Sequence, residues 1–223
     1  MDLALTELAE RLVKGYAPVE LCAVPRTRLN AEERQADILR AAVEQIELRG
    51  VAELRLSDVA SALGVSNALV IYHFESKENL VAAAFTYAAE ADLDHLKLLV
   101  ARPASAERRI RAVIRWYSPT GKAKGWRLWI EGWAVSLREP TLRNVAADLD
   151  RQWRAALVDV IENGVTAGEF TCPDPRSSAE RLTALIDGLA VRMTVHPGLV
   201  SRAATDSWVN EALARELGLP GRK

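Results

Sequence analysis

Apolar residues recur at the spacing of an α-helix along nearly the whole chain, and this periodicity is the feature that most constrains the fold. Sustained apolar–polar alternation, which is typical of a half-buried strand, is absent from the 223 residues. Glycine and proline fall mainly between the periodic segments, where they can end one helix and precede the next. The sequence therefore predicts an all-α protein.

The order of the predicted helices follows from the periodic segments and from the residues between them. A partly ordered amphipathic segment at 2–15 and a proline-containing connector at 17–29 come first. Asn30 can cap the next helix, with Glu33 in the position of a capping box, and Gly50 suits its end. We expect the further helices near residues 56–63, 66–74, 76–100, 106–117, 122–137, 142–165, 177–195 and 200–217.

The balance of charge excludes a uniformly cationic polymer-binding protein, because 29 basic and 30 acidic residues leave a net charge of -1. Hydrophobic residues make up 49% of the chain, which is ordinary for a soluble globular protein. Cys22 and Cys172 cannot by themselves build a disulfide framework or a zinc finger. No apolar stretch reaches the roughly 18 residues that span a bilayer, and the chain does not begin with the pattern of a signal peptide. We therefore expect a cytoplasmic protein without a membrane partner.

Residues 56–74 carry the strongest local signal, which is two short predicted helices around a tight turn. Gly64 can adopt the positive φ that such a turn requires, and Ser66 can cap the second helix. The outward face of that helix fits the major groove of DNA, where Asn67 can hydrogen-bond a base and Ala68 can touch a thymine methyl group. The candidate DNA-binding residues are Arg55, Ser66, Asn67, Ala68, Ile71, Tyr72, His73 and Lys77.

The same pattern occurs in proteins that never bind DNA, and the local charge does not decide between the two interpretations. Residues 25–80 include seven basic and nine acidic side chains. Affinity for DNA must then come from the placement of side chains rather than from bulk charge. Tyr72 or His73 can reach a phosphate, and Lys77 offers a positive charge at the start of the next helix.

A series of short motifs between Ile38 and Leu80 has a specific order and spacing. The motifs are Ala41-Ala42, Gly50, Asp58-Val59-Ala60, Gly64-Val65-Ser66, His73-Phe74, Ser76-Lys77-Glu78 and Leu80. Together they resemble the DNA-binding domain of the TetR family of bacterial transcriptional regulators. More weakly, residues 168–170 and 185–189 resemble the ligand-binding half of regulators of the choline-repressor type. The resemblance implies an N-terminal three-helix helix-turn-helix domain followed by a larger helical domain.

We divide the chain accordingly into an N-terminal extension at 1–29, a DNA-binding domain at 30–78, and a ligand-binding and dimerisation domain at 79–223. Two positions depart from the family's pattern. Ile71 stands where the family commonly has tyrosine, and Arg55 stands where threonine or serine often opens the first motif helix. At the second position a charged contact to phosphate can replace one from a hydroxyl group.

Tryptophan residues mark the candidate ligand site in the larger domain. Trp126, Trp129 and Trp133 stand at positions i, i+3 and i+7 and therefore share one helical face. The candidate ligand-binding residues are Trp116, Trp126, Trp129, Trp133 and Trp153, with Tyr117 beside them. They predict a pocket for a small apolar or aromatic effector, whereas a cage for a quaternary ammonium ion and a well-packed core are the alternatives. Asp187 or Arg192 can meet a polar atom of such a ligand.

The last two predicted helices carry more apolar surface than one small bundle easily hides. The candidate dimerisation residues are Leu185, Leu189, Met193, Trp208 and Leu213. The resemblance implies that this helix pair packs against its copy as a four-helix interface. A two-fold dimer presents its reading helix twice and suits a near-palindromic operator. Gly188 can allow a close approach between helices.

Catalytic motifs of the common types are absent from the sequence. Asp92 and Asp94 lie beside His95 and can in principle bind a metal, although we interpret this cluster as a solvated helix face. We expect no enzyme activity, no cofactor and no metal.

These features together predict a ligand-responsive transcriptional regulator, a repressor that binds double-stranded DNA as a homodimer. Its effector would act by changing the separation of the two reading helices. We expect this coupling to run through the long helix that begins after Ser76, because that helix joins the motif to the pocket. The alternative is an all-α small-molecule-binding protein or enzyme without specific DNA binding.

Overall fold

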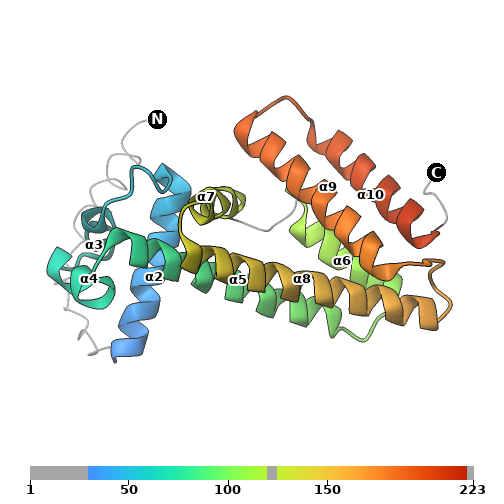
Figure 1. The fold of residues 1–223 in the computed structure, drawn as a ribbon, viewed down its shortest axis with the longest axis horizontal. Coiled ribbons are helices and arrows are strands. Elements are labelled where there is room, and N and C mark those ends of the chain that lie inside the picture. The colour runs from blue at the N-terminus through green and yellow to red at the C-terminus, as the bar shows by residue number, and fades with distance from the viewer. Residues whose placement is uncertain (1–29, 120–124, 220–223) are drawn as a thin grey trace, which may run out of the picture. The chain divides into compact units, whose positions relative to one another are not determined.

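A computed structural model describes residues 30–119 and 125–219, and every regular element in these ranges is an α-helix (Figure 1). The prediction of an all-α fold is therefore confirmed. The segments expected at 2–15 and 17–29 lie outside the described residues. The helices are α2 (Ala31–Arg49), α3 (Leu56–Leu63), α4 (Asn67–Phe74), α5 (Lys77–Val100), α6 (Ala106–Tyr117), α7 (Trp126–Ser136), α8 (Pro140–Thr166), α9 (Pro175–Val195) and α10 (Arg202–Leu217).

The chain divides into two compact units, residues 1–34 and residues 35–223. The described part of the first unit is the start of α2, which has the predicted capping box. The Asn30 N–H donates to Glu33 Oε2 at 2.9 Å, and the Glu33 N–H donates to Asn30 Oδ1 at 2.7 Å. This reciprocal pair satisfies two donors that the first helical turn leaves free.

The helix-turn-helix lies in the second unit and is built as the sequence predicts. Gly64 ends α3 with a φ of 64°, and the Val65 N–H closes the turn on the Ala60 carbonyl oxygen at 3.0 Å. The Ser66 Oγ then caps α4 by accepting a hydrogen bond from the Leu69 N–H at 3.3 Å. Val70, on the inner side of α4, is buried and anchors that helix to the core.

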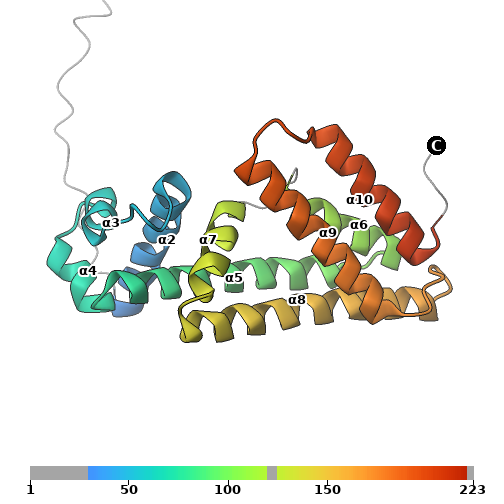
Figure 2. The ribbon, with the colours of Figure 1, turned by 45° about the horizontal axis from the view of Figure 1, so that its top comes forward.

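Helix α8 is the centre of the larger helical assembly, because it packs against α5, α6, α7 and α9. α5 and α8 lie side by side along much of their lengths, and α9 pairs with α10 (Figure 2). The interior between these helices is apolar and includes the fully buried side chains of Leu96, Ile110, Leu157, Ile161 and Leu182. Within the described residues, no helix has both the length and the apolar composition that a membrane span needs.

Two helices begin earlier than the periodicity predicts, and both begin at a proline. α8 starts at Pro140 rather than at 142, and α9 starts at Pro175 rather than at 177. Proline suits the first turn of a helix because its missing N–H would find no intrahelical partner there. Asp174 caps α9 by accepting from the Ser177 N–H at 3.1 Å.

Helix α7 packs closely on α5 because Gly132 faces the ring of Phe85, where a Cβ atom would collide with it. Next to this contact the Phe85 and Trp129 rings meet edge to face, with centroids 5.0 Å apart. This packing holds α7, which carries three of the candidate ligand-binding tryptophans, directly against α5, the helix that follows the helix-turn-helix.

Candidate DNA-binding and effector sites

Helix α4 presents its N-terminal residues and one side to solvent. Ser66, Asn67 and Ala68 are exposed, and farther along the helix Ile71 is 43% exposed and Tyr72 is 80% exposed. Such an outward face of an N-terminally capped helix matches the element that a helix-turn-helix places in the major groove. The residues that the sequence predicts as base contacts therefore lie on one accessible surface.

Three other candidate DNA-binding residues also make contacts within the protein. Arg55 is exposed at the start of α3, where its backbone N–H donates to Asp58 Oδ2 at 3.0 Å. His73 is half-buried and packs edge to face against Tyr72, with ring centroids 5.4 Å apart. The Lys77 ammonium donates to the Ala52 carbonyl oxygen at 2.9 Å. Lys77 thus holds the segment before α3 to the start of α5, and the other two N–H groups of the ammonium remain for further bonds.

The connection between α4 and α5 is a tight turn at Glu75, which sequence reasoning missed. Glu75 is the one non-glycine residue with positive φ in the described ranges, at 63°. The Ser76 N–H donates across it to the Phe74 carbonyl oxygen at 2.6 Å, as in a γ-turn. A side chain in this conformation costs about 1–3 kcal/mol, and glutamate gives no sequence signal for it. This turn sets the direction of α4, the helix that carries the candidate base contacts, relative to α5.

A small, partly open cavity lies where α6, α7, α8 and α9 meet, and we call it the aromatic cavity. Its lining residues are Tyr117, Trp129, Trp133, Leu149, Asp150, Trp153 and Asp187. The volume open to the centre of a water molecule is about 30 Å³, enough for about two waters. The rings are closely spaced, with the centroids of Tyr117 and Trp153 at 4.1 Å and those of Trp129 and Trp133 at 6.2 Å.

The structure brings the five predicted tryptophans together in one aromatic cluster, but only three of them line the cavity. Trp116 lies behind Trp153, with ring centroids 5.9 Å apart. Trp126 packs against Tyr117, with centroids 4.9 Å apart. These two outer tryptophans support the lining rings, whereas Trp129, Trp133 and Trp153 face the cavity.

Two carboxylates share the aromatic cavity with the rings. Asp187 accepts a hydrogen bond from the Tyr117 hydroxyl at 2.7 Å. Burial raises the pKa of Asp187 to about 6, although this hydrogen bond acts in the opposite direction. Burial also raises the pKa of Asp150, whose Oδ2 lies 2.6 Å from the Arg154 guanidinium. The sequence pointed to Asp187 as a polar contact for a ligand but not to Asp150.

A third carboxylate, Asp92, lies next to the cavity lining. It accepts a hydrogen bond from the Trp129 indole N–H at 3.2 Å, and burial raises its pKa to about 6. The interpretation of residues 92–95 as a solvated face is therefore wrong for Asp92, because α5 turns this residue toward α7. Asp94 instead pairs with Lys97 at 2.8 Å, and the His95 ring packs on Trp116. In the described ranges no three acidic, histidine or cysteine side chains gather as metal ligands.

Helix α7 also contacts the end of α2 directly, through what we call the α2–α7 contact of Glu47, Arg127 and Glu131. Glu47 Oε1 accepts from the Leu128 N–H at 2.9 Å and so caps the start of α7. The Arg127 guanidinium donates to the Glu47 and Leu48 carbonyl oxygens, both at 3.3 Å, near the end of α2. Each helix end thus receives a charge of the sign that its dipole favours.

The loop after α2 completes the α2–α7 contact. Glu131 accepts a hydrogen bond from the Val51 N–H at 2.5 Å. Gly50 has a φ of 83°, and a Cβ atom there would collide with the Glu131 and Arg127 side chains. Glycine at this position therefore permits both the turn and the close approach of α7.

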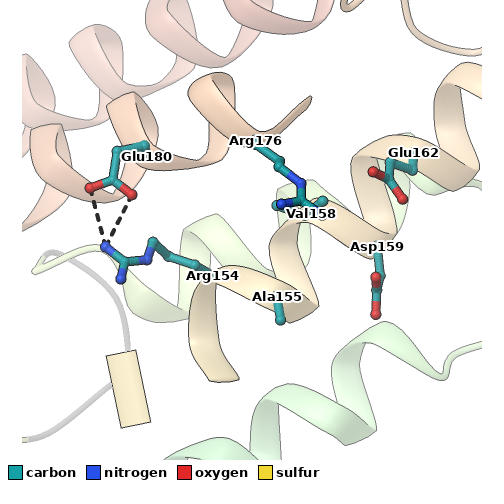
Figure 3. Close-up of a pocket in the computed structure, with 7 residues that line it drawn as sticks. All are labelled: Arg154, Ala155, Val158, Asp159, Glu162, Arg176 and Glu180. Atoms are coloured by element: carbon teal, nitrogen blue, oxygen red, sulfur yellow. Dashed lines mark hydrogen bonds and ion pairs between the residues drawn. The ribbon is translucent and has the colours of Figure 1, made fainter. Parts of the chain in front are cut away.

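A larger and more open cavity of about 360 Å³ lies between α8 and the first turns of α9 (Figure 3). Its lining residues are Arg154, Ala155, Val158, Asp159, Glu162, Arg176 and Glu180. Arg154 bonds both carboxylate oxygens of Glu180 there, at 3.1 and 3.0 Å, and also holds Asp150 of the aromatic cavity. This surface cavity is charged and lacks aromatic rings, so it differs in kind from the aromatic cavity.

The candidate dimerisation residues divide between the surface and the interior. Trp208 is 47% exposed, and Leu185 and Met193 are half-buried. Leu189 and Leu213 are buried within the chain's own core, at 5% and 0% exposure. The prediction that these two side chains lie on a dimer surface needs correction, because they occupy the inner faces of α9 and α10. Val191 and Val195 are exposed on α9 instead.

An exposed helix-turn-helix joined to a helical domain that has a cavity lined by aromatic rings is the architecture of a ligand-binding transcriptional regulator, and comparison with known proteins agrees. Residues 38–84 match the family "Bacterial regulatory proteins, tetR family". Residues 106–218, half of the chain, match the family "BetI-type transcriptional repressor, C-terminal". The chain therefore belongs to the TetR family of transcriptional regulators, with a C-terminal ligand-binding domain of the BetI type.

Individual relatives support this membership. The HTH-type transcriptional regulator BetI of Pseudomonas paraeruginosa is 26% identical over 172 residues, which cover 71% of this chain and 80% of the relative. BetI of Paraburkholderia phytofirmans is 28% identical over 169 residues, covering 72% and 82%. A transcriptional regulator of Saccharomonospora viridis, crystallised in complex with choline, has a TM-score of 0.76 and 27% identity over 83% of this chain and 98% of that chain.

Proposed function

We propose that this regulator is a homodimeric repressor whose effector is a small quaternary ammonium ion bound in the aromatic cavity. The observation that carries the proposal is that three tryptophans and a tyrosine line the same small cavity as Asp150 and Asp187. Aromatic faces attract cations, most strongly when water is excluded. The choline in the related S. viridis regulator supports this class of ligand.

The carboxylates favour a cation over the apolar or aromatic effector that the tryptophans alone suggest. A carboxylate that loses its water on burial is costly to keep ionised, as the raised pKa of Asp187 reflects. A cation next to Asp187 would offset that cost, whereas an apolar ligand would increase it by excluding the remaining water. The cavity chemistry is therefore better matched to a positive charge surrounded by methyl groups.

For DNA, we propose that Asn67 and Ala68 contact base edges and that Arg55 and Lys77 contact phosphates. The exposed N-terminal end of α4 supports the first pair of roles. We further propose that α9 and α10 form the dimer interface, with Val191, Val195 and Trp208 as contact residues because they are apolar and exposed. Such a dimer would bind a near-palindromic operator in the cytoplasm, where bacterial DNA is found.

The size of the aromatic cavity suggests how the effector would weaken DNA binding. A ligand larger than about two water molecules must displace lining rings, and Trp129 and Trp133 belong to α7. A shift of α7 would act on the end of α2 through the α2–α7 contact as well as on α5 through Gly132. Effector binding would therefore be coupled to DNA binding directly through α7 and α2, in addition to the coupling through α5 that the sequence suggested. A coupling of about 1–3 kcal/mol would change operator affinity about 5–150-fold.

Calorimetry with the full chain tests the effector class. Choline is compared with 3,3-dimethylbutan-1-ol, which replaces the charged nitrogen by carbon and keeps the shape. We expect choline to bind and the neutral alcohol to bind at least about 30-fold more weakly, since desolvated charge pairs contribute this much. Equal affinity for both compounds would favour an apolar effector, and no binding of either would reject the site.

Selection of bound sequences from a random duplex pool tests the DNA-binding half of the proposal. We expect a symmetric motif with half-sites whose centres are about one helical turn or a multiple of it apart. Adding choline to the complex should release that duplex. Enrichment of no motif, or of a single asymmetric half-site, would contradict a dimeric repressor.

A further inference from the structure

A third cavity lies where the start of α5 meets the loop after α2 and the turn between α7 and α8, and we call it the junction cavity. Its lining comes from residues within 51–52, 77–82 and 135–142. Its volume is about 360 Å³, within the range of about 300–1,000 Å³ that is usual for small-molecule sites. The aromatic cavity, by comparison, offers about 30 Å³. The junction cavity is therefore large enough to admit a small organic molecule without displacing its lining.

The apolar part of this lining comes from three helices. Val81 and Ala82 lie on α5, Val135 lies on α7 and Leu142 lies on α8. Val81 and Leu142 are buried, whereas Ala82 and Val135 are half-buried. Covering this surface with an apolar group of a ligand would remove it from water, which is favourable. The junction cavity therefore suits a molecule with an apolar body.

Lys77 supplies a positive charge that is held in place at this cavity. Its ammonium donates to the Ala52 carbonyl oxygen at 2.9 Å, and both residues belong to the lining. This partner is a neutral carbonyl oxygen rather than a carboxylate, and two further N–H groups of the ammonium remain. A carboxylate of a ligand is the matching acceptor, because hydrogen bonds between two charged groups are the strong ones.

The other charged residues of the lining do not reverse this preference. Arg138 adds a second cation from the turn between α7 and α8, while Glu78 and Glu139 add two carboxylates. All three side chains are exposed, so water screens their charges and they are free to turn outward. Lys77, in contrast, is half-buried and held by its hydrogen bond. The junction cavity therefore favours an anionic group next to Lys77.

We infer that the junction cavity binds a small organic carboxylate, with the carboxylate group on Lys77 and the apolar body between α5, α7 and α8. The same ammonium is proposed above to contact a DNA phosphate, so the ligand and DNA compete for it. The carboxylate thus acts as a second effector, separate from the aromatic cavity, and weakens operator binding. This effect on DNA rests on the proposed function, whereas the binding of the carboxylate does not.

Calorimetry of the full chain with three compounds of similar size tests the inference. Cyclohexanecarboxylate is negative, cyclohexylmethanol is neutral and cyclohexylmethylammonium is positive. The carboxylate is expected to bind at least about tenfold more tightly than the alcohol, which is the effect of one hydrogen bond between charged groups. The ammonium ion is expected to bind more weakly than the alcohol. Equal affinities, a preference for the ammonium ion, or no binding of the carboxylate would overturn the inference.

Lys77→Met keeps the length of the side chain and removes its charge. This variant is expected to reduce the preference for the carboxylate over the alcohol to less than about twofold. The matched control is Lys97→Met, because Lys97 is an exposed lysine of the same helix that does not line the junction cavity. The control should keep the preference of the parent. An unchanged preference in Lys77→Met, or an equal loss in Lys97→Met, overturns the role of Lys77.

Ala82→Leu tests the position of the ligand without changing a charge, and it decides if Lys77→Met does not fold. The larger side chain fills part of the junction cavity and should weaken the binding of both the carboxylate and the alcohol at least about fivefold, the effect of overfilling a packed site. Operator affinity without ligand should stay within about twofold. Ala147→Leu, on the exposed surface of α8, is the control. Unchanged carboxylate affinity in Ala82→Leu would place the ligand elsewhere and overturn the inference.

Fluorescence anisotropy with the selected operator separates this inference from the proposed function. Saturating cyclohexanecarboxylate should weaken operator binding about two- to fivefold, the effect of one exposed charge pair, and should not weaken it further in Lys77→Met. Carboxylate binding that depends on Lys77 but leaves operator affinity unchanged would overturn the role as a second effector. Failure of the chain to select a duplex or to bind choline would overturn the proposed function, whereas the calorimetric result for the carboxylate would stand.

Discussion

The candidate DNA contacts on α4 and the aromatic cavity differ in how the chain assembles them. α4 is eight residues long and presents its contacts to solvent from one continuous stretch of sequence. The aromatic cavity takes its lining from α6, α7, α8 and α9 and includes Asp187, a carboxylate that is largely removed from water. A surface motif depends on a local cap and turn, whereas the cavity depends on packing and on the cost of burying charge. Substitutions on α4 should therefore change operator affinity, whereas substitutions at the aromatic cavity should change effector affinity.

The largest expected effect is at the cavity. Asp187→Asn removes the charge that faces the effector and should weaken choline binding at least about 30-fold, because truncating one partner of a desolvated charge pair costs 2 kcal/mol or more. Operator affinity without choline should stay within about twofold. Calorimetry and fluorescence anisotropy measure the two quantities. The control is Asp94→Asn on the exposed side of α5, and an equal loss in that variant would contradict the assignment.

The next effect belongs to the reading helix. Asn67→Ala should weaken binding to the selected operator by roughly 10- to 30-fold, since a good base contact contributes about 1–3 kcal/mol. Binding to unrelated duplexes should change little, and choline affinity should not change. Anisotropy titrations with both duplexes test this, with Asn144→Ala on the exposed surface of α8 as the control. A uniform loss on every duplex would make Asn67 a backbone contact.

The pH dependence of choline binding distinguishes the two regions without a mutation. The raised pKa of Asp187, about 6, means that this carboxyl becomes neutral as the pH falls through that value. Choline keeps its charge throughout, so its affinity should fall about tenfold between pH 7 and pH 5. Asp187→Asn should remove most of this dependence. An affinity that does not change over this range would show that Asp187 does not face the bound cation.

The sequence predicted the helix-turn-helix almost completely but the aromatic cavity only in part. Gly64, Ser66 and the outward residues of α4 act within one short segment, so helical spacing and capping rules were sufficient. Whether Asp92 is buried depends on where α7 packs against α5. The spacing of apolar residues within α5 cannot predict that packing. Leu189 and Leu213 were assigned to a dimer surface because an apolar stripe predicts burial without saying what buries it.

The smallest expected effect lies between the two regions, at the α2–α7 contact. Glu47→Ala removes the cap of α7 and should reduce the effect of choline on operator affinity about threefold, within the range for residues that carry coupling. Choline affinity and operator affinity measured separately should each stay within about twofold. Titrations of the operator complex with and without choline give the coupling. Glu44→Ala, an exposed glutamate on α2, is the control, and the same loss there would contradict a specific role for Glu47.

The γ-turn at Glu75 has a consequence for the kind of operator that this regulator can distinguish. Because the turn between α4 and α5 is only three residues long, the two helices keep a fixed angle to each other. A displacement of α5 therefore moves α4 with it. In a paired molecule, rotation of α5 would then alter the distance between the two α4 helices while each keeps its own set of base contacts. Operators that differ by one inserted base pair between identical half-sites would therefore respond differently to the effector than operators with altered half-sites.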